Sequence, residues 1–90
     1  MKSFVFKPAA PAAFATFAMM DRADSIRTAT LDLAHGHYAL ILTCPAVFED
    51  AESVFDHVNL ETAYSMNPGD VIVWANGKRE LCLSKGWADI

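Results

Sequence analysis

The sequence predicts an α+β fold, in which a small antiparallel sheet of two β-hairpins has one amphipathic helix packed on it. Three observations predict it. Residues 45–58 repeat their apolar side chains at helical spacing, and residues 71–84 form two strand-like runs around an Asn-Gly turn. Residues 26–44 hold two further strand-like runs that a short turn separates. The chain of 90 residues is long enough for one domain with one core, so residues 1–90 are taken as a single domain.

The N-terminal part of the chain is expected to add a strand and a short helix. Phe4 and Phe6 recur at the two-residue period of a short strand. Pro11 suits the first turn of an alanine-rich helix over residues 12–22, and a strand through the same residues is the alternative. Residues 21–25 then form a turn or the end of that helix.

The first hairpin is predicted from two consecutive runs. Residues 26–33 are rich in β-branched side chains, and residues 37–44 form a continuous apolar run of strand length. Residues 34–36 between them are short enough to close an antiparallel hairpin. Because the second run is apolar on both faces, we expect it to be a central strand.

The helix over residues 45–58 has the clearest pattern in the chain. Pro45 suits its first turn, early carboxylates favour the positive end of its dipole, and Asn59 suits its end. The apolar side chains fall within about one third of the helical wheel. They are Val47, Phe48, Ala51, Val54, Phe55 and Val58.

The second hairpin is specified by its turns. Residues 67–70 place Pro and Gly as a type II turn requires, and a strand follows over residues 71–74. Asn76 and Gly77 favour a two-residue type I′ turn, and the return strand covers residues 79–84.

A two-residue turn also predicts the pairing of this hairpin. Trp74 would pair with Arg79, whose guanidinium would stack on the indole. The other pairs would be Ile72 with Leu81 on the same face, and Val73 with Glu80 and Val71 with Cys82 on the opposite face.

Composition places the chain among globular proteins of a reducing compartment. It is 53% hydrophobic and 20% charged, which excludes disorder of the whole chain. Cys44 and Cys82 lie in apolar runs without a Cys-x-x-Cys spacing, so we expect buried thiols. Pro8 and Pro11 interrupt the alanine-rich N-terminus, which disfavours a secretory signal, and no run of about 20 apolar residues is present. The expected location is the cytoplasm of a bacterial host, without a membrane partner.

The sequence carries no motif for catalysis or for a cofactor. His35 and His37 lie near Asp32, but Gly36 favours a turn with exposed histidines over a metal site, and convincing further ligands are missing. No nucleophile elbow, phosphate loop or HExxH pattern occurs. We therefore expect a protein that is not an enzyme and that binds no cofactor or metal.

Two surfaces are candidate binding sites. The first is acidic and would attract a basic protein partner, although a merely solvated helix face explains the same charges. Its residues are Glu49, Asp50, Glu52, Asp56 and Glu61. The second is basic and aromatic and is the alternative for nucleic acid, which an acidic chain of net charge −4 disfavours. Its residues are Trp74, Lys78, Arg79, Lys85 and Trp87.

A third alternative is a small homodimeric structural subunit. The mean hydropathy of +0.21 is high for so short a chain, and burial of the apolar surplus between two copies would explain it.

The chain from about residue 54 to residue 90 resembles the small YodL-like domain. The resemblance rests on VFDHVN and on YSMNPGDVIVWANGKRELCLSKGWADI, with Asn67-Pro68 in place of the family's usual small polar pair. The matching positions are Asn59, Ser65, Met66, Gly69, Asp70, Val71, Ile72, Val73, Cys82, Ser84, Gly86, Trp87 and Ile90.

This resemblance implies a genomic context and no catalytic residues. YodL-like domains are typical of plasmids, integrative elements and phages. It therefore implies an accessory protein that binds and inhibits a host protein complex, for example as an anti-CRISPR or antirestriction protein does. The partner would be a host complex such as a CRISPR effector or a restriction enzyme.

Overall fold

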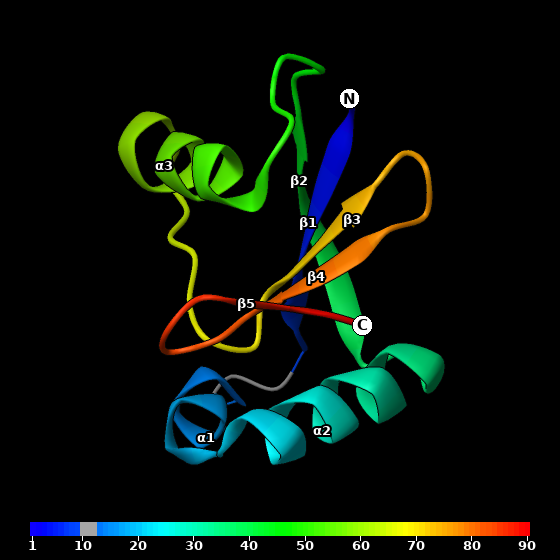
Figure 1. The fold of residues 1–90 in the computed structure, drawn as a ribbon. Coiled ribbons are helices and arrows are strands. Elements are labelled where there is room, and N and C mark those ends of the chain that lie inside the picture. Colours follow the sequence, from blue (N-terminus) through cyan, green and yellow to red (C-terminus); the bar gives the residue numbers. More distant parts are fainter. Residues whose placement is uncertain (10–12) are drawn as a thin grey trace.

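The protein forms an α+β fold with an antiparallel sheet, as expected, and this sheet has five strands (Figure 1). The computed structural model describes residues 1–9 and 13–90. The strand order is β2-β1-β3-β4-β5. The strands are β1 (Ser3–Pro8), β2 (Tyr38–Cys44), β3 (Val71–Trp74), β4 (Arg79–Cys82) and β5 (Trp87–Asp89). The helices are α1 (Ala13–Met19), α2 (Arg22–Ala34) and α3 (Ala51–Glu61).

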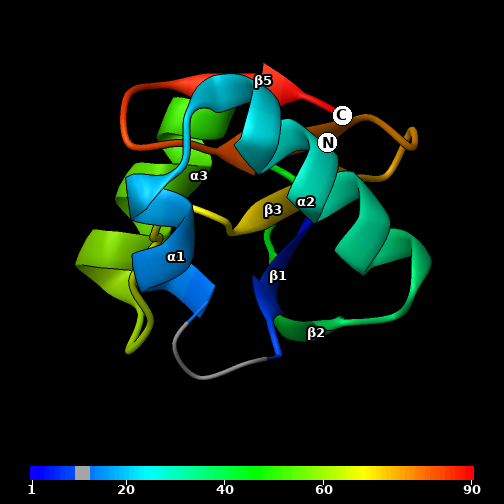
Figure 2. The same cartoon turned by 90° about the horizontal axis from the view of Figure 1, so that it is seen from below.

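Helices cover both faces of the sheet, whereas the sequence predicted one packed helix. Figure 1 shows α3 apart from α1 and α2, and Figure 2 shows α1 and α2 in front of the sheet when the molecule is seen from below. Neighbouring residues of one strand enter different cores, because side chains of a strand alternate between its faces. Ile72 joins the core beneath α3, and Val71 joins the core beneath α1 and α2. We call these the α3 core and the α1/α2 core.

The prediction for residues 26–33 is wrong, because they form most of α2 and not a strand. Asp21, predicted to lie in a turn or at the end of a helix, instead caps the start of α2 by accepting a hydrogen bond from the backbone of Asp24. Ser25 and Ala29 are buried four residues apart. Small side chains on one helix face allow close packing on the sheet, and this tertiary contact outweighs the strand propensity of the threonines.

The predicted hairpin over residues 26–44 is therefore absent. Residues 34–36 end α2, where Gly36 adopts a φ of +73° and donates to the carbonyl of Leu33. The strand predicted over residues 37–44 is confirmed as β2, but it is an edge strand and not a central one. β1 takes the central place, because it pairs with β2 on one side and with β3 on the other.

The N-terminal expectations are confirmed in part. The strand around Phe4 and Phe6 is β1, and the helix predicted over residues 12–22 is α1, which ends earlier. The expected first turn at Pro11 lies outside the described residues. Phe17 of α1 is buried in the α1/α2 core.

The helix predicted from Pro45 begins six residues later. Asp50 caps α3 by accepting from the backbone of Ser53, so the preceding residues form an irregular connection, and Val47 is 76% exposed. The helix continues past Asn59 to Glu61. Asn59 does not end it but accepts a hydrogen bond from the backbone of Met66, which holds the next loop.

The β3–β4 hairpin is confirmed, but its turn and pairing differ from the prediction. The turn has three residues, since the backbones of Trp74 and Lys78 pair and Gly77 alone takes a positive φ, of +91°. The longer turn shifts the pairing by one residue. The observed pairs are Val71 with Leu81, Ile72 with Glu80 and Val73 with Arg79.

The shift changes which face each β4 side chain reaches. Leu81 was expected beside Ile72 and instead lies in the α1/α2 core. The turn over residues 67–70 is confirmed, with Gly69 at a φ of +98° and the backbone of Asp70 donating to Asn67. The short strand β5 was not predicted.

Candidate functional site

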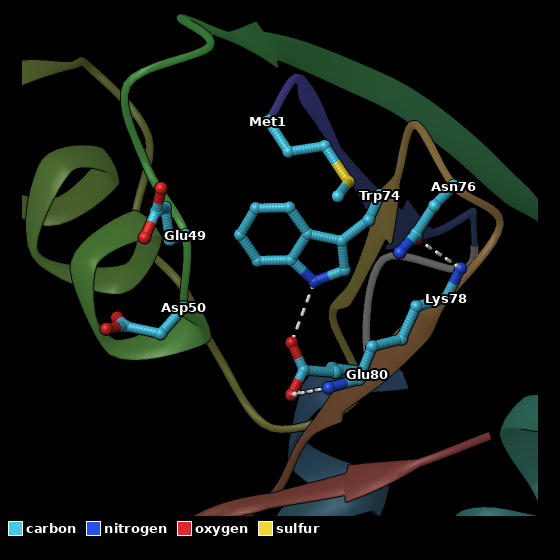
Figure 3. A pocket seen from close by; sticks show the side chains of 7 residues that line it. All are labelled: Met1, Glu49, Asp50, Trp74, Asn76, Lys78 and Glu80. Carbon is cyan, nitrogen blue, oxygen red and sulfur yellow. Dashed lines mark hydrogen bonds and ion pairs between the residues drawn. The ribbon is translucent and has the colours of Figure 1, made fainter.

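A cavity of about 340 Å³ opens between the start of α3 and the β3–β4 hairpin (Figure 3). It combines an aromatic wall with charged side chains from three separate parts of the chain. The lining residues are Met1, Glu49, Asp50, Trp74, Asn76, Lys78 and Glu80.

The fold brings these parts together at one end of the sheet. The amino group of Met1 donates to the carbonyls of Ala46, at 2.7 Å, and Phe48, at 3.1 Å. These bonds hold the connection between β2 and α3 beside the start of β1. Glu49 and Asp50 thereby line the cavity from the α3 side, but the Asp50 carboxylate turns back toward α3 and away from the indole (Figure 3).

Trp74 forms the wall of the cavity at the last position of β3. Its indole belongs to the α3 core and is only 4% exposed. The indole Nε1 donates to the Glu80 carboxylate at 2.7 Å, and the other oxygen of that carboxylate lies 3.7 Å from Lys78 Nζ. Glu80 is therefore fixed in place, and Trp74 keeps its one polar atom satisfied.

The charges around the cavity are negative only in small excess. Glu49, Asp50 and Glu80 oppose two cations, the amino group of Met1 and Lys78, whose ammonium also lies 4.0 Å from Asp89. Hydrogen bonds from the backbone and then the hydroxyl of Ser53 hold the pKa of Asp50 below its ordinary value. The cap is thus ionised at neutral pH, and the cavity suits a cationic group.

The five predicted acidic residues do not form one row. Asp50 is the helix cap, and Glu52 accepts a hydrogen bond from the Trp87 indole at 3.0 Å. Glu61 lies at the far end of α3 and is 2.8 Å from His57. Glu49 and Asp56 are exposed, and no hydrogen bond or ion pair within the described part of the chain occupies their carboxylates.

The basic and aromatic set does not form one surface either. Trp74 lies in the α3 core, whereas Arg79 leaves the sheet on the opposite face and donates to the carbonyl of Ile90. The predicted stacking of Arg79 on Trp74 is therefore wrong. Lys85 lies in the exposed connection between β4 and β5, and Trp87 packs edge-on against Phe55 with ring centroids 6.3 Å apart.

The histidines and cysteines show no assembled site among the described residues. No group of three His, Cys, Asp or Glu side chains gathers there to hold a metal. His35 and His37 are exposed, as expected. Cys44 and Cys82 are buried free thiols, and burial raises the pKa of both, that of Cys82 to about 12. Neutral thiols of this kind are poor nucleophiles.

The sequence reasoning missed an ion pair at the other end of the hairpin. Asp70 is 1% exposed, and its Oδ2 lies 2.5 Å from Lys7 Nζ, which also donates to the carbonyl of Ser65. The backbone of Asn67 donates to the same carboxylate at 2.8 Å. The sequence signalled the turn but not this contact, because Lys7 comes beside Asp70 only through the pairing of β1 with β3.

Burial raises the pKa of the Asp70 carboxyl, against the opposing influence of Lys7 and of the Asn67 backbone. Nearby, the Tyr38 hydroxyl donates to the carbonyl of Gly69 at 2.6 Å, and burial raises the pKa of this phenol above its ordinary value. These contacts tie β1, β2 and the turn together, so Asp70 acts in folding.

No protein-family model matches the chain, and neither do the curated proteins or the solved structures with which it was compared. Within residues 1–9 and 13–90, no helix is both long and apolar enough to cross a bilayer.

Proposed function

We infer that this protein is a non-enzymatic accessory protein of a mobile genetic element that binds and inhibits a host protein complex. The contact would be the cavity between α3 and the β3–β4 hairpin, together with the exposed acids of α3. The single observation that carries the proposal is the position of Glu49 and Glu80 on the two sides of the Trp74 wall.

This arrangement fits the end of a basic side chain. Carboxylates on both sides of the opening would accept its hydrogen bonds, and charge-assisted bonds are the stronger kind. The aliphatic stem of a lysine or arginine would lie against Met1 and the indole edge. Acidic side chains at the rim would also speed association with a positively charged surface.

The choice of partner class rests on the resemblance over residues 54–90. A YodL-like context would make the partner a host defence or replication complex, of which a CRISPR effector or a restriction enzyme is an example. Such complexes hold nucleic acid in positively charged grooves, and an acidic protein can occupy these grooves. The nucleic-acid alternative loses support because Trp74 and Arg79 lie on opposite faces of the sheet.

In the first step, the tagged protein is used to capture binding partners from a bacterial lysate, and mass spectrometry identifies the retained complex. The binding of the retained complex is then compared for Glu49→Lys and Asp89→Lys. Both are exposed acids and both changes raise the net charge by two, but Glu49 lines the cavity, whereas Asp89 lies outside it, 4.0 Å from Lys78 Nζ. Glu52 is left unchanged because its carboxylate holds Trp87.

Glu49→Lys should weaken binding by at least about tenfold, whereas Asp89→Lys should change it little. Higher salt should slow association of the wild type. Equal binding by both variants would contradict the proposal, provided that both melt at the wild-type temperature.

A further inference from the structure

Within residues 1–9 and 13–90, the outer edge of β2 carries no further strand. β2 is the first strand of the sheet order, and it pairs with β1. β1 takes the hydrogen bonds of one side of β2, so the backbone donors and acceptors of its other side face outward. An open edge of this kind is a template for a further strand.

The side chains of β2 do not protect this edge. Its sequence, YALILTC, contains no charged residue and no proline, which are two of the usual means of blocking strand addition, and its one irregularity is the register shift at Ile41. Ala39, Leu40 and Thr43 are exposed, and Leu40 is 52% exposed. The irregular pairing opposite Val5 and Phe6 places Leu40 beside Phe6, on the α1/α2 side of the sheet.

The two edges of the sheet differ in this respect. The opposite edge strand, β5, has three residues, ends in the exposed Asp89, and has the carbonyl of Trp87 occupied by Arg22 at 3.3 Å. That edge is short, charged and partly covered. β2 has seven residues and none of these features.

We propose that β2 pairs antiparallel with β2 of a second copy of this chain about a two-fold axis, so that the two sheets become one continuous sheet. Antiparallel pairing about such an axis joins a strand to itself, and a closed two-fold dimer is the commonest oligomer. The net charge of −4 per chain does not oppose this contact, because the strand itself is uncharged. The pairing uses none of the residues that line the acidic cavity, so it does not depend on the proposed function.

The first test measures the mass of the full chain by light scattering as its concentration rises. A species of twice the 9.9 kDa chain mass should accumulate. Leu40→Lys should raise the dissociation constant at least about tenfold, because it places a charge on the edge. Leu31→Lys is the control, since Leu31 is also 52% exposed but lies on α2.

Three results would overturn the proposal. They are a monomer at all concentrations up to about 1 mM, a dimer that Leu40→Lys leaves intact, or equal loss of the dimer in both variants. Thermal melting identifies a variant that fails to fold, and in that case Thr43→Lys replaces Leu40→Lys, since Thr43 is exposed on the same strand.

The second test follows amide hydrogen exchange in residues 38–44. Their outward-facing amides should exchange rapidly in dilute protein and become protected where the dimer forms. A dimer in which these amides exchange as fast as in the monomer pairs through another surface, and that result also contradicts the proposal.

Discussion

The β3–β4 hairpin carries a carboxylate arrangement at each end, and the two are built for different purposes. Asp70 is 1% exposed and meets Lys7 and the backbone of Asn67 from within its own fold. Glu80 meets Trp74 and Lys78, but it lines an open cavity beside two further acids. The first arrangement is buried and ties the turn to β1, and the second leaves carboxylates at the mouth of a cavity. Substitutions at the two ends should therefore affect different measurements.

The largest effect is expected at the closed end, for Gly69→Ala. The φ of +98° already disfavours a side chain, and a Cβ would lie 2.7 Å from Cγ of the buried Phe17. The two penalties together should lower the free energy of unfolding by about 3 kcal/mol in urea denaturation.

Gly77→Ala is the matched control for that substitution. Gly77 has a similar φ of +91°, but a Cβ there would meet no atom within 4 Å. Gly77→Ala should therefore lower the free energy of unfolding by only about 1 kcal/mol, the cost of a side chain at positive φ. Equal losses at both glycines would show that Phe17 does not limit the turn.

Asp70→Ala should destabilise the protein by about 2 kcal/mol in the same assay, because Lys7 and the Asn67 backbone lose their acceptor. Asp70→Asn should destabilise the protein less, since an amide oxygen can still accept the hydrogen bond from the backbone of Asn67. If the alanine and asparagine variants were equally unstable, the charge and not the hydrogen bonding of Asp70 would hold the turn.

At the open end, Trp74→Phe should lower the free energy of unfolding by about 1 kcal/mol. The substitution keeps most of the apolar contact in the α3 core but removes the Nε1 bond to Glu80. Released from the indole, Glu80 should become mobile, so partner binding should weaken although the fold persists. Calorimetry with the retained host complex measures this effect. A loss of stability larger than that of Asp70→Ala would overturn the division between the two ends.

The sequence alone was sufficient to predict the turn and the strands whose residue patterns are local. The type II turn at residues 67–70 and the runs that became β1, β2 and β3 depend on neighbouring residues alone. The helical conformation of α2 was not predictable from neighbouring residues, because it depends on burying Ser25 and Ala29 against the sheet. The N-caps Asp21 and Asp50 were visible signals that the runs of β-branched and apolar residues obscured.

The candidate site was predictable only in part. Glu49 and Asp50 were singled out from their charge, and both line the cavity. Glu80 was not, because it reaches Trp74 only in the register that the three-residue turn imposes. A shift of one residue moves every side chain of a strand to the other face, so the sequence alone placed Glu80 on the wrong side.

The smallest expected effect is a difference in pH dependence between Asp70 and Asp50. Burial raises the pKa of Asp70 above its ordinary value of 3.8, so its contribution to stability is present below 3.8 and is lost as the pH rises through the raised value. Hydrogen bonds from Ser53 lower the pKa of Asp50, so its contribution is present above 3.8 and is lost as the pH falls through the lowered value.

Urea midpoints measured across the acid range should separate the two signs. Relative to Asp70→Asn, the wild type should gain stability as the pH falls from neutral towards 3.8. Relative to Asp50→Asn, which keeps a capping side chain, the wild type should lose stability as the pH falls below 3.8. Parallel profiles for the wild type and Asp70→Asn would mean that Lys7 fully compensates the burial of Asp70. In that case the ion pair with Lys7 would offset the whole cost of burying the Asp70 carboxylate.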